Sequence, residues 1–226
     1  MPKRHRLHGL VCDVLIEDDP SSLFEIPHLD AKGYGLDCRE LFCSTVRDAS
    51  RSNRKPYLVN PADSSSRWRE SVGLPQEPYL DCGERLKMTS SRIPGVHTAY
   101  ECYSTGWGSG SAMHVEDGYL GSMNLVLAGA PKVWLLVQPR FHEKLEAKVK
   151  EELMEDTESY VCSQFVRHLN KLLSPELLDS WEIPYHTVPC KAGEMIVTLS
   201  ETYHQVINAG TNYAVAVNFA VEPDWT

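Results

Sequence analysis

Short apolar runs that are separated by glycine or proline fill the chain from about Gly95 onward. Runs of this length, bounded by residues that favour turns, are typical of β-strands. In the last run, Val215, Val217 and Phe219 alternate with alanines and Asn218, as in a strand with one buried face. The predicted strands are Val96–Ser104, Met113–Val115, Met123–Leu127, Val133–Val137, Tyr185–Val188, Met195–Leu199, His204–Ile207 and Tyr213–Phe219.

Between the two sets of strands, apolar residues recur at every fourth position, which is the spacing of one face of a helix. The first predicted helix, Arg140–Leu153, has an apolar stripe made of Phe141, Leu145, Val149 and Leu153. Ser159–Leu173 predicts a second helix, and a third begins with Ser174 as its N-cap and Pro175 in its first turn. Strands, a helical insertion and further strands that pair with the first set are the order expected of a jelly roll.

The N-terminal part of the chain shows weaker periodicity. Residues 8–16 predict a buried strand, residues 17–22 predict a turn, and the apolar spacing of Leu36–Asp48 predicts a helix. Two polar stretches predict exposed loops, at Ala49–Lys55 and Asp63–Arg69.

Together these patterns predict a mainly β fold, a double-stranded β-helix of the jelly-roll or cupin-like type with a helical insertion and flanking helices. A chain of 226 residues is long enough for one large β domain. We therefore expect a single domain over residues 1–226. Residues 1–95 would supply flanking strands and helices, residues 96–226 the jelly-roll core, and residues 140–181 the helical insert.

The chain carries a formal charge of −9, which disfavours binding to nucleic acid through its phosphates. An acidic surface suits a basic partner such as a Lys/Arg-rich peptide, although the same charge also serves solubility alone. No apolar run reaches the length of a membrane-spanning helix. The 7 cysteines include no CxxC pair and indicate reduced intracellular thiols instead of a disulfide framework.

His114, Glu116 and His204 are the strongest chemical signal in the chain. Two imidazoles and one carboxylate are the smallest protein ligand set for a non-haem Fe(II) centre that keeps coordination positions open. His114 and Glu116 are two positions apart, so on a strand both side chains would leave the same face. His204 would have to arrive on another strand, which fits a sheet that closes around a metal. The alternative for His114 and Glu116 is a buried structural histidine with an ion-pair partner.

Longer stretches around these residues resemble the Jumonji C (JmjC) family, and the helical insert resembles its histone lysine demethylase branch. The similarity extends from about Gly95 to Trp225 and is thin before Gly95. A set of motifs this long, in this order, is far more specific than an isolated HxE. The stretches that carry the resemblance are Gly106–Trp134, Ala192–Gly210, Ala216–Ala220, Cys162–His168, Leu173–Leu178 and Ile183–Pro184.

The resemblance implies that His114, Glu116 and His204 bind Fe(II), and that 2-oxoglutarate chelates the same iron through its keto-acid end. The distal carboxylate of this cosubstrate needs a cation, and Lys132 stands at the family position for it. Further cosubstrate contacts are implied for Asn124, Ser111 and Tyr57. The residues around Tyr57 do not match the family, so a buried structural tyrosine is the alternative there.

Tyr100, Tyr103 and Asn218 match positions that face the substrate in relatives. Tyrosine faces attract a methylammonium group, which is how methyl-lysine is usually held. The alternative for Tyr100 and Tyr103 is that they are ordinary aromatic residues of a sheet. One residue more than usual separates Tyr100 from His114, so the register of this strand stays open.

A structural zinc site is a weaker implication of the resemblance. Cys162 and His168 have the spacing of half of such a site in one demethylase branch. A zinc site needs four ligands, and the other two would lie beyond Thr226.

The predicted function is therefore oxidative demethylation of methyl-lysine on histone tails, in the nucleus. Lys3, Arg4 and Arg6 would serve nuclear import, or else form a solvated basic end. Two alternatives keep the fold: a JmjC hydroxylase that leaves a stable hydroxyl group, and a chromatin-bound scaffold without turnover. A metal-dependent cupin isomerase or oxidase is a more distant alternative, since it would need neither Lys132 nor Asn124.

Overall fold

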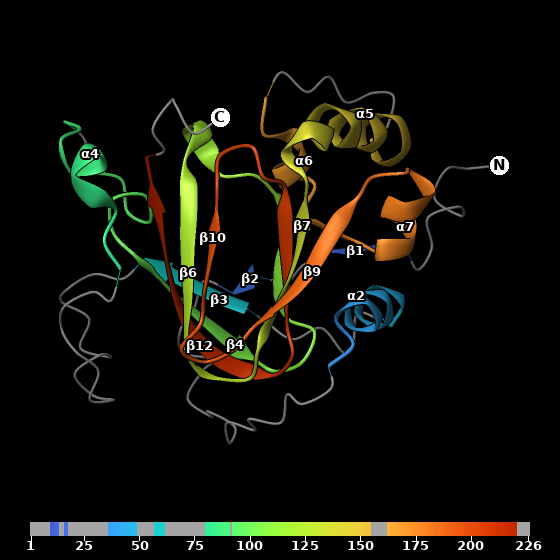
Figure 1. The fold of residues 1–226 in the computed structure, drawn as a ribbon, viewed down its shortest axis with the longest axis horizontal. Coiled ribbons are helices and arrows are strands. Elements are labelled where there is room, and N and C mark those ends of the chain that lie inside the picture. The colour runs from blue at the N-terminus through green and yellow to red at the C-terminus, as the bar shows by residue number, and fades with distance from the viewer. Residues whose placement is uncertain are drawn as a thin grey trace.

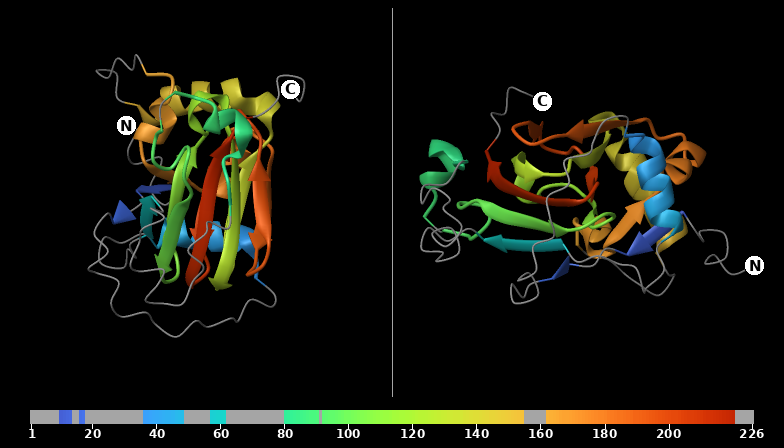
Figure 2. Two further views of the ribbon diagram at one scale, coloured as in Figure 1. Left: turned by 90° about the vertical axis from the view of Figure 1, so that its left-hand side faces the viewer. Right: turned by 90° about the horizontal axis from the view of Figure 1, so that it is seen from below.

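Two β-sheets lie face to face at the centre of the protein, and helices cover one of them (Figure 1, Figure 2). The computed structural model describes residues 10–13, 16–17, 36–48, 57–61, 80–90, 92–154 and 162–220. The remaining residues, which include the predicted loops at 49–55 and 63–69 and most of the predicted turn at 17–22, lie outside this description.

The larger sheet has six strands, and every pair except one is antiparallel. The strands lie in the order β10 (Met195–Thr198), β6 (Gly121–Gly129), β12 (Thr211–Phe219), β4 (Tyr100–Thr105), β3 (Tyr57–Pro61) and β2 (Ile16–Glu17). The parallel pair is β2 with β3, at one edge of the sheet.

The smaller sheet has four antiparallel strands. Their order is β5 (Gly110–His114), β11 (His204–Asn208), β7 (Lys132–Val137) and β9 (Tyr185–Cys190). A separate two-stranded ladder joins β1 (Val11–Asp13) to β8 (Lys171–Leu173).

Side chains alternate along β7 between two hydrophobic regions. Val133, Leu135 and Val137 pack on the helices that cover the smaller sheet, whereas Trp134 points between the two sheets. These helices are α2 (Cys38–Arg47), α5 (His142–Leu153), α6 (Phe165–His168) and α7 (Pro175–Ser180). The short helices η3 (Asp117–Tyr119), η4 (Pro139–Phe141) and α4 (Gly83–Lys87) complete the described elements.

The structure confirms the predicted jelly-roll order of strands, helices and strands. The stripe of the first inserted helix is real, because Leu145 and Val149 are fully buried. The predicted N-cap is present, because the Ser174 hydroxyl accepts a hydrogen bond from the Leu177 amide. Helix α2 also has an N-cap, which was not predicted: Asp37 accepts a hydrogen bond from the Glu40 amide.

The predicted helix over residues 159–173 is wrong. Among its described residues only Phe165–His168 are helical, and Lys171–Leu173 form strand β8. Asn170 adopts a left-handed conformation with φ of 52°, which separates the helical turn from the strand. Leu172 and Leu173 are buried through pairing with β1 far away in the sequence, and local periodicity does not reveal such a contact.

Two predicted strands also differ in extent. The stretch 8–16 was expected to be one strand, but β1 pairs with β8 and β2 pairs with β3 in a different sheet. The strand predicted from Val96 begins only at Tyr100, because Gly95 has a φ of 82° and residues 94–97 form a turn. None of the helices in the described ranges is long and apolar enough to cross a membrane.

Candidate metal centre and its pocket

Strand pairing brings the two candidate histidines together. His204 at the start of β11 is the ladder partner of His114 at the end of β5, and the two ring centroids are 4.3 Å apart. The sequence predicted that Glu116 lies on the same strand as His114, but β5 ends at His114. The backbone of Glu116 is still extended, with φ of −69° and ψ of 145°, so the alternation of side chains continues past the strand.

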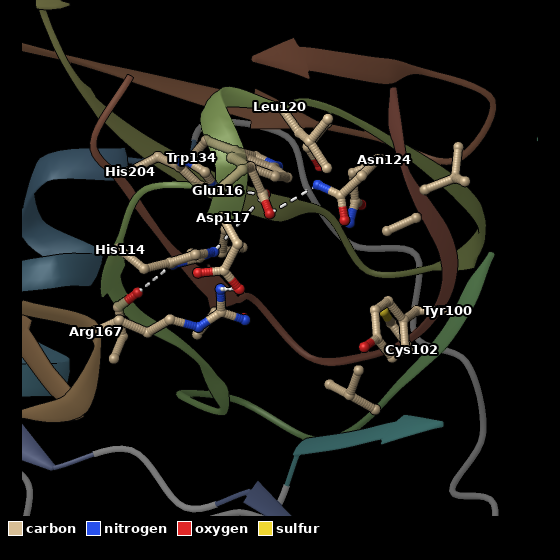
Figure 3. A pocket seen from close by; sticks show the side chains of 18 of the residues that line it. Tyr100, Cys102, His114, Glu116, Asp117, Leu120, Asn124, Trp134, Arg167 and His204 are labelled. Carbon is tan, nitrogen blue, oxygen red and sulfur yellow. Dashed lines mark hydrogen bonds and ion pairs between the residues drawn. The ribbon is translucent and has the colours of Figure 1, made fainter. Parts of the chain in front are cut away.

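Glu116 completes the group. Its Oε1 lies 3.9 Å from His114 Nε2 and 3.6 Å from His204 Nε2. One ligand atom from each of the three side chains lies within 4.8 Å of the others, and in the described part of the chain this is the only group of three or more such donors. The side chains converge on one point in Figure 3.

Both histidines are held in the same tautomer by a backbone carbonyl group two residues earlier in the chain. His114 Nδ1 lies 2.7 Å from the Ala112 carbonyl oxygen, and His204 Nδ1 lies 2.9 Å from that of Thr202. A carbonyl oxygen only accepts hydrogen bonds, so Nδ1 carries the proton in each ring. The lone pair of each Nε2 therefore faces the group, as in histidines that bind metals.

The charge states also suit a metal. Burial lowers the pKa of both imidazoles, that of His204 to about 4, so each ring is neutral near pH 7. Burial alone would raise the pKa of Glu116, but the two imidazoles and the Asn218 amide hold it below its ordinary value. Asn218 Nδ2 donates to Glu116 Oε2 at 2.9 Å. Neutral histidines and an ionised carboxylate are the forms that bind metal ions.

A cavity of about 580 Å³ extends from this group between the two sheets. At its other end lies Lys132, which is only 1% exposed. Its Nζ donates to the Tyr57 hydroxyl at 2.8 Å, and no described carboxylate pairs with it. Burial lowers the pKa of Lys132, because a buried ammonium without an anion is costly.

Other polar atoms along the cavity lack partners among the described residues. Trp134 Nε1 and Asn124 Oδ1 are buried without a hydrogen bond. Ser111 also lines the cavity, and its hydrogen bond to the Tyr57 hydroxyl lowers the pKa of that phenol, although burial is the larger effect and raises it. A buried cation and a free indole N–H fit an anionic ligand, whereas the Asn124 oxygen calls for a hydrogen-bond donor.

The structure does not bring Tyr103 to the cavity. Alternate side chains of β4 face opposite sides of the sheet, and Tyr103 stacks on Tyr213 with ring centroids 4.8 Å apart. Tyr100 and Cys102 face the cavity instead, across from His114 (Figure 3). The structure therefore places Tyr103 outside the cavity lining, and Cys102 is a lining residue that sequence reasoning missed. One residue more than usual separates Tyr100 from His114, and this was the sign that the inward face of this strand could not be assigned from the sequence.

Two further lining residues were missed. Arg167 Nη1 and Asp117 Oδ2 form an ion pair of 3.0 Å, and both side chains are largely exposed, so the pair lies where the cavity meets solvent. Asp117 directly follows Glu116 and could have been suspected from the sequence. Arg167 lies on α6, and no local pattern indicates that this helix reaches the cavity.

The zinc prediction gains no support from the described residues. Cys162 is exposed, and its thiol accepts a hydrogen bond from the Gln164 amide at 3.4 Å. Within the ranges that the structure describes, Cys162 and His168 belong to no group of three potential ligands.

Comparison with known proteins agrees with this geometry. The sequence model of the family described as "JmjC domain, hydroxylase" matches residues 101–219, a span that contains all three candidate ligands. The chain belongs to the JmjC family. The JmjC fold explains why two neighbouring strands of the smaller sheet, β5 and β11, and the extended segment after β5 meet at one point.

Several JmjC relatives are named as demethylases. The chain is 39% identical over 133 residues to lysine-specific demethylase 4D of Rattus norvegicus, which covers 59% of this chain and 25% of the relative. The probable lysine-specific demethylase 4F of Homo sapiens is 38% identical over 133 residues, covering 59% of this chain and 20% of the relative. Lysine-specific demethylase 4B of Mus musculus is 34% identical over 128 residues, covering 57% and 12%. The chain thus spans at most a quarter of the length of these relatives.

Proposed function

We propose that this JmjC protein is an Fe(II)- and 2-oxoglutarate-dependent dioxygenase that demethylates methyl-lysine on histone tails. The observation that carries the proposal is the presence, in one cavity, of the group of His114, Glu116 and His204 and of the buried cation of Lys132. Two imidazoles and a carboxylate suit non-haem iron, and the distant cation suits the far carboxylate of 2-oxoglutarate. Bound iron would supply the oxidation of an N-methyl group by O2, with succinate, CO2 and formaldehyde as products.

The protein's own residues would bind and orient the reactants. Nε2 of each histidine and Oε1 of Glu116 would hold the metal on one side and leave its other side open to the cavity. Lys132 and the Tyr57 hydroxyl would bind the distal carboxylate with charge-assisted hydrogen bonds. The indole N–H of Trp134 supplies a further buried donor.

The substrate would enter past Asp117 and Arg167. Tyr100 offers an aromatic face to a methylammonium group, and the Asp117 carboxylate is the acidic group at the opening. The charge of −9 favours the approach of a basic histone tail, and such a substrate would place the protein in the nucleus.

The test is formaldehyde release from a panel of methylated histone peptides, after anaerobic loading with Fe(II) and 2-oxoglutarate. We expect formaldehyde and succinate in equal amounts with at least one peptide, and none when either cofactor is omitted. Binding of both cofactors without formaldehyde from any peptide would contradict the demethylase assignment.

A second candidate function, side-chain hydroxylation, is favoured by the wall of the cavity at β4. Only Tyr100 of the two predicted tyrosines faces inward, and Cys102 is its inward-facing neighbour, so a full aromatic cage for methylammonium is not formed there. A hydroxylase would add one oxygen atom to its peptide and release no formaldehyde, and mass spectrometry separates these outcomes.

A further inference from the structure

Cys102 is the one thiol that lines the cavity in the described part of the chain. It lies on β4, across the cavity from the metal group, and forms a hydrogen bond with the Tyr57 side chain. The Lys132 ammonium also interacts electrostatically with Cys102. The thiol is therefore next to the two groups that would bind a carboxylate.

The cavity around Cys102 carries independent signs of an absent anionic ligand. Lys132 is buried without a described carboxylate partner, and Trp134 Nε1, a donor, has no described hydrogen-bond partner. Trp134 lines the cavity and is only 3% exposed, so its indole N–H is shielded from bulk solvent. The ligand that satisfies these groups would lie against the Cys102 thiol.

We propose that Cys102 is a site of covalent modification by small unsaturated dicarboxylates, of which fumarate is the simplest. The proposal rests on the proposed function, because the carboxylate-binding groups are those assigned to 2-oxoglutarate. In the reaction the thiol adds across the carbon–carbon double bond. A carbon–sulfur bond forms, the π bond breaks, and the thiol proton passes to the neighbouring carbon, so that no oxidant or reductant is needed. The adduct would fill the space of 2-oxoglutarate and inactivate the enzyme.

Charge and burial should make this modification selective. Cys102 is 3% exposed and is reached only through the cavity, so bulky thiol reagents are excluded. The Lys132 ammonium binds the carboxylate of the reagent beside this thiol. 2-Oxoglutarate has no double bond of this kind, so it occupies the cavity without reacting.

Two other cysteines provide internal controls. Cys162 is exposed and lies outside the cavity, so it reports the ordinary reactivity of a surface thiol. Cys190 is as buried as Cys102 and belongs to the same hydrophobic cluster, but it does not line the cavity. Selective modification of Cys102 would therefore reflect the cavity and not burial or exposure alone.

The test compares fumarate with its neutral dimethyl ester on the full chain, with each cysteine followed by peptide mass spectrometry. The ester is the stronger electrophile, so it should modify Cys162 faster than fumarate does. At Cys102 the order should reverse, because only the diacid is held by Lys132. 2-Oxoglutarate at ten times its Kd should slow modification of Cys102 about tenfold and leave Cys162 unaffected.

Cysteine variants test which thiol is modified without relying on a comparison of reagents. Cys102→Ser should remove the fumarate adduct that 2-oxoglutarate prevents, whereas Cys190→Ser should retain it. If Cys102→Ser does not fold, mapping of the wild-type protein still decides the question. Measured binding of 2-oxoglutarate without any fumarate adduct on Cys102, or an adduct that 2-oxoglutarate does not prevent, would overturn this inference and leave the proposed function intact. A lack of 2-oxoglutarate binding would overturn both.

Discussion

The two ends of the cavity are built in different ways. At the metal end, each histidine is oriented by a carbonyl oxygen two residues earlier in the chain, Ala112 for His114 and Thr202 for His204. At the other end, Lys132 meets Tyr57, which is 75 residues away in the sequence and on the opposite sheet. The local backbone therefore orients the candidate metal ligands, whereas contacts between distant parts of the chain form the candidate carboxylate site.

The two ends also differ in how well their polar groups are satisfied. Glu116 Oε2 accepts a hydrogen bond from Asn218, whereas its Oε1 faces the Nε2 atoms of two neutral imidazoles. Lys132 is a buried ammonium whose one hydrogen bond among the described residues is to the Tyr57 hydroxyl. The metal end is ready for a cation, and the Lys132 end is incomplete without an anion. Mutations should therefore separate the two ends.

The largest expected effect follows from removing a metal ligand. His204→Ala leaves two protein ligands, and we expect it to abolish both turnover and stoichiometric iron binding. Iron content after anaerobic loading and gel filtration, measured with activity on the same sample, checks this. His186→Ala, on β9 and outside the cavity, is the matched control and should keep both properties. Retained activity in His204→Ala would reject the metal-site assignment.

Lys132→Met should have a smaller effect, confined to the end of the cavity that holds Lys132. Loss of a charge-assisted contact of about 3 kcal/mol should weaken 2-oxoglutarate binding about a hundredfold. Iron binding should stay unchanged, because Lys132 contacts none of the metal ligands. The thermal midpoint should not fall, since the variant replaces a buried unpaired charge with an apolar side chain of similar length.

Calorimetric titration of 2-oxoglutarate and thermal denaturation together test the Lys132→Met variant. Lys148→Met is the control, because Lys148 pairs with Glu151 on the surface of α5. A variant of Lys132 that is strongly destabilised yet binds 2-oxoglutarate normally would show that the lysine is structural.

The smallest of the three effects is expected for Asn218→Ala. Asn218 would act on the metal only through Glu116, which would remain a ligand in the variant, so iron affinity should fall about tenfold. Competition with a chelator of known affinity measures the change. 2-Oxoglutarate affinity of the iron-loaded protein should stay the same. An unaltered iron affinity would mean that Asn218 contacts the substrate, as the sequence suggested, and does not position Glu116.

The metal end could be predicted from the sequence because its information is local. The HxE spacing, the strand pattern around His204 and the family resemblance together predicted the three side chains that the structure brings into one group. The exact end of β5 was not predictable, since Glu116 keeps an extended backbone after the ladder stops. Although the strand ends earlier than predicted, the Glu116 carboxylate still lies beside the two histidines.

The β4 wall could not be predicted because a shift of one residue exchanges the faces of a strand. The extra residue before His114 left both registers open, and the structure chose the one that turns Tyr103 outward and Cys102 inward. Strand β8 was missed for a related reason, since its pairing with β1 links residues far apart in the sequence. Arg167 lies in the same stretch of the chain as β8, and only tertiary packing brings its side chain to the cavity.

The most direct test of the central claim is a crystal structure of the protein loaded anaerobically with Fe(II) and 2-oxoglutarate, with anomalous diffraction recorded at the iron edge. One strong anomalous peak should lie within bonding distance of His114 Nε2, His204 Nε2 and a Glu116 carboxylate oxygen. The far carboxylate of 2-oxoglutarate should lie against Lys132. An iron peak elsewhere, or one that lacks any of these three side chains, would contradict the account.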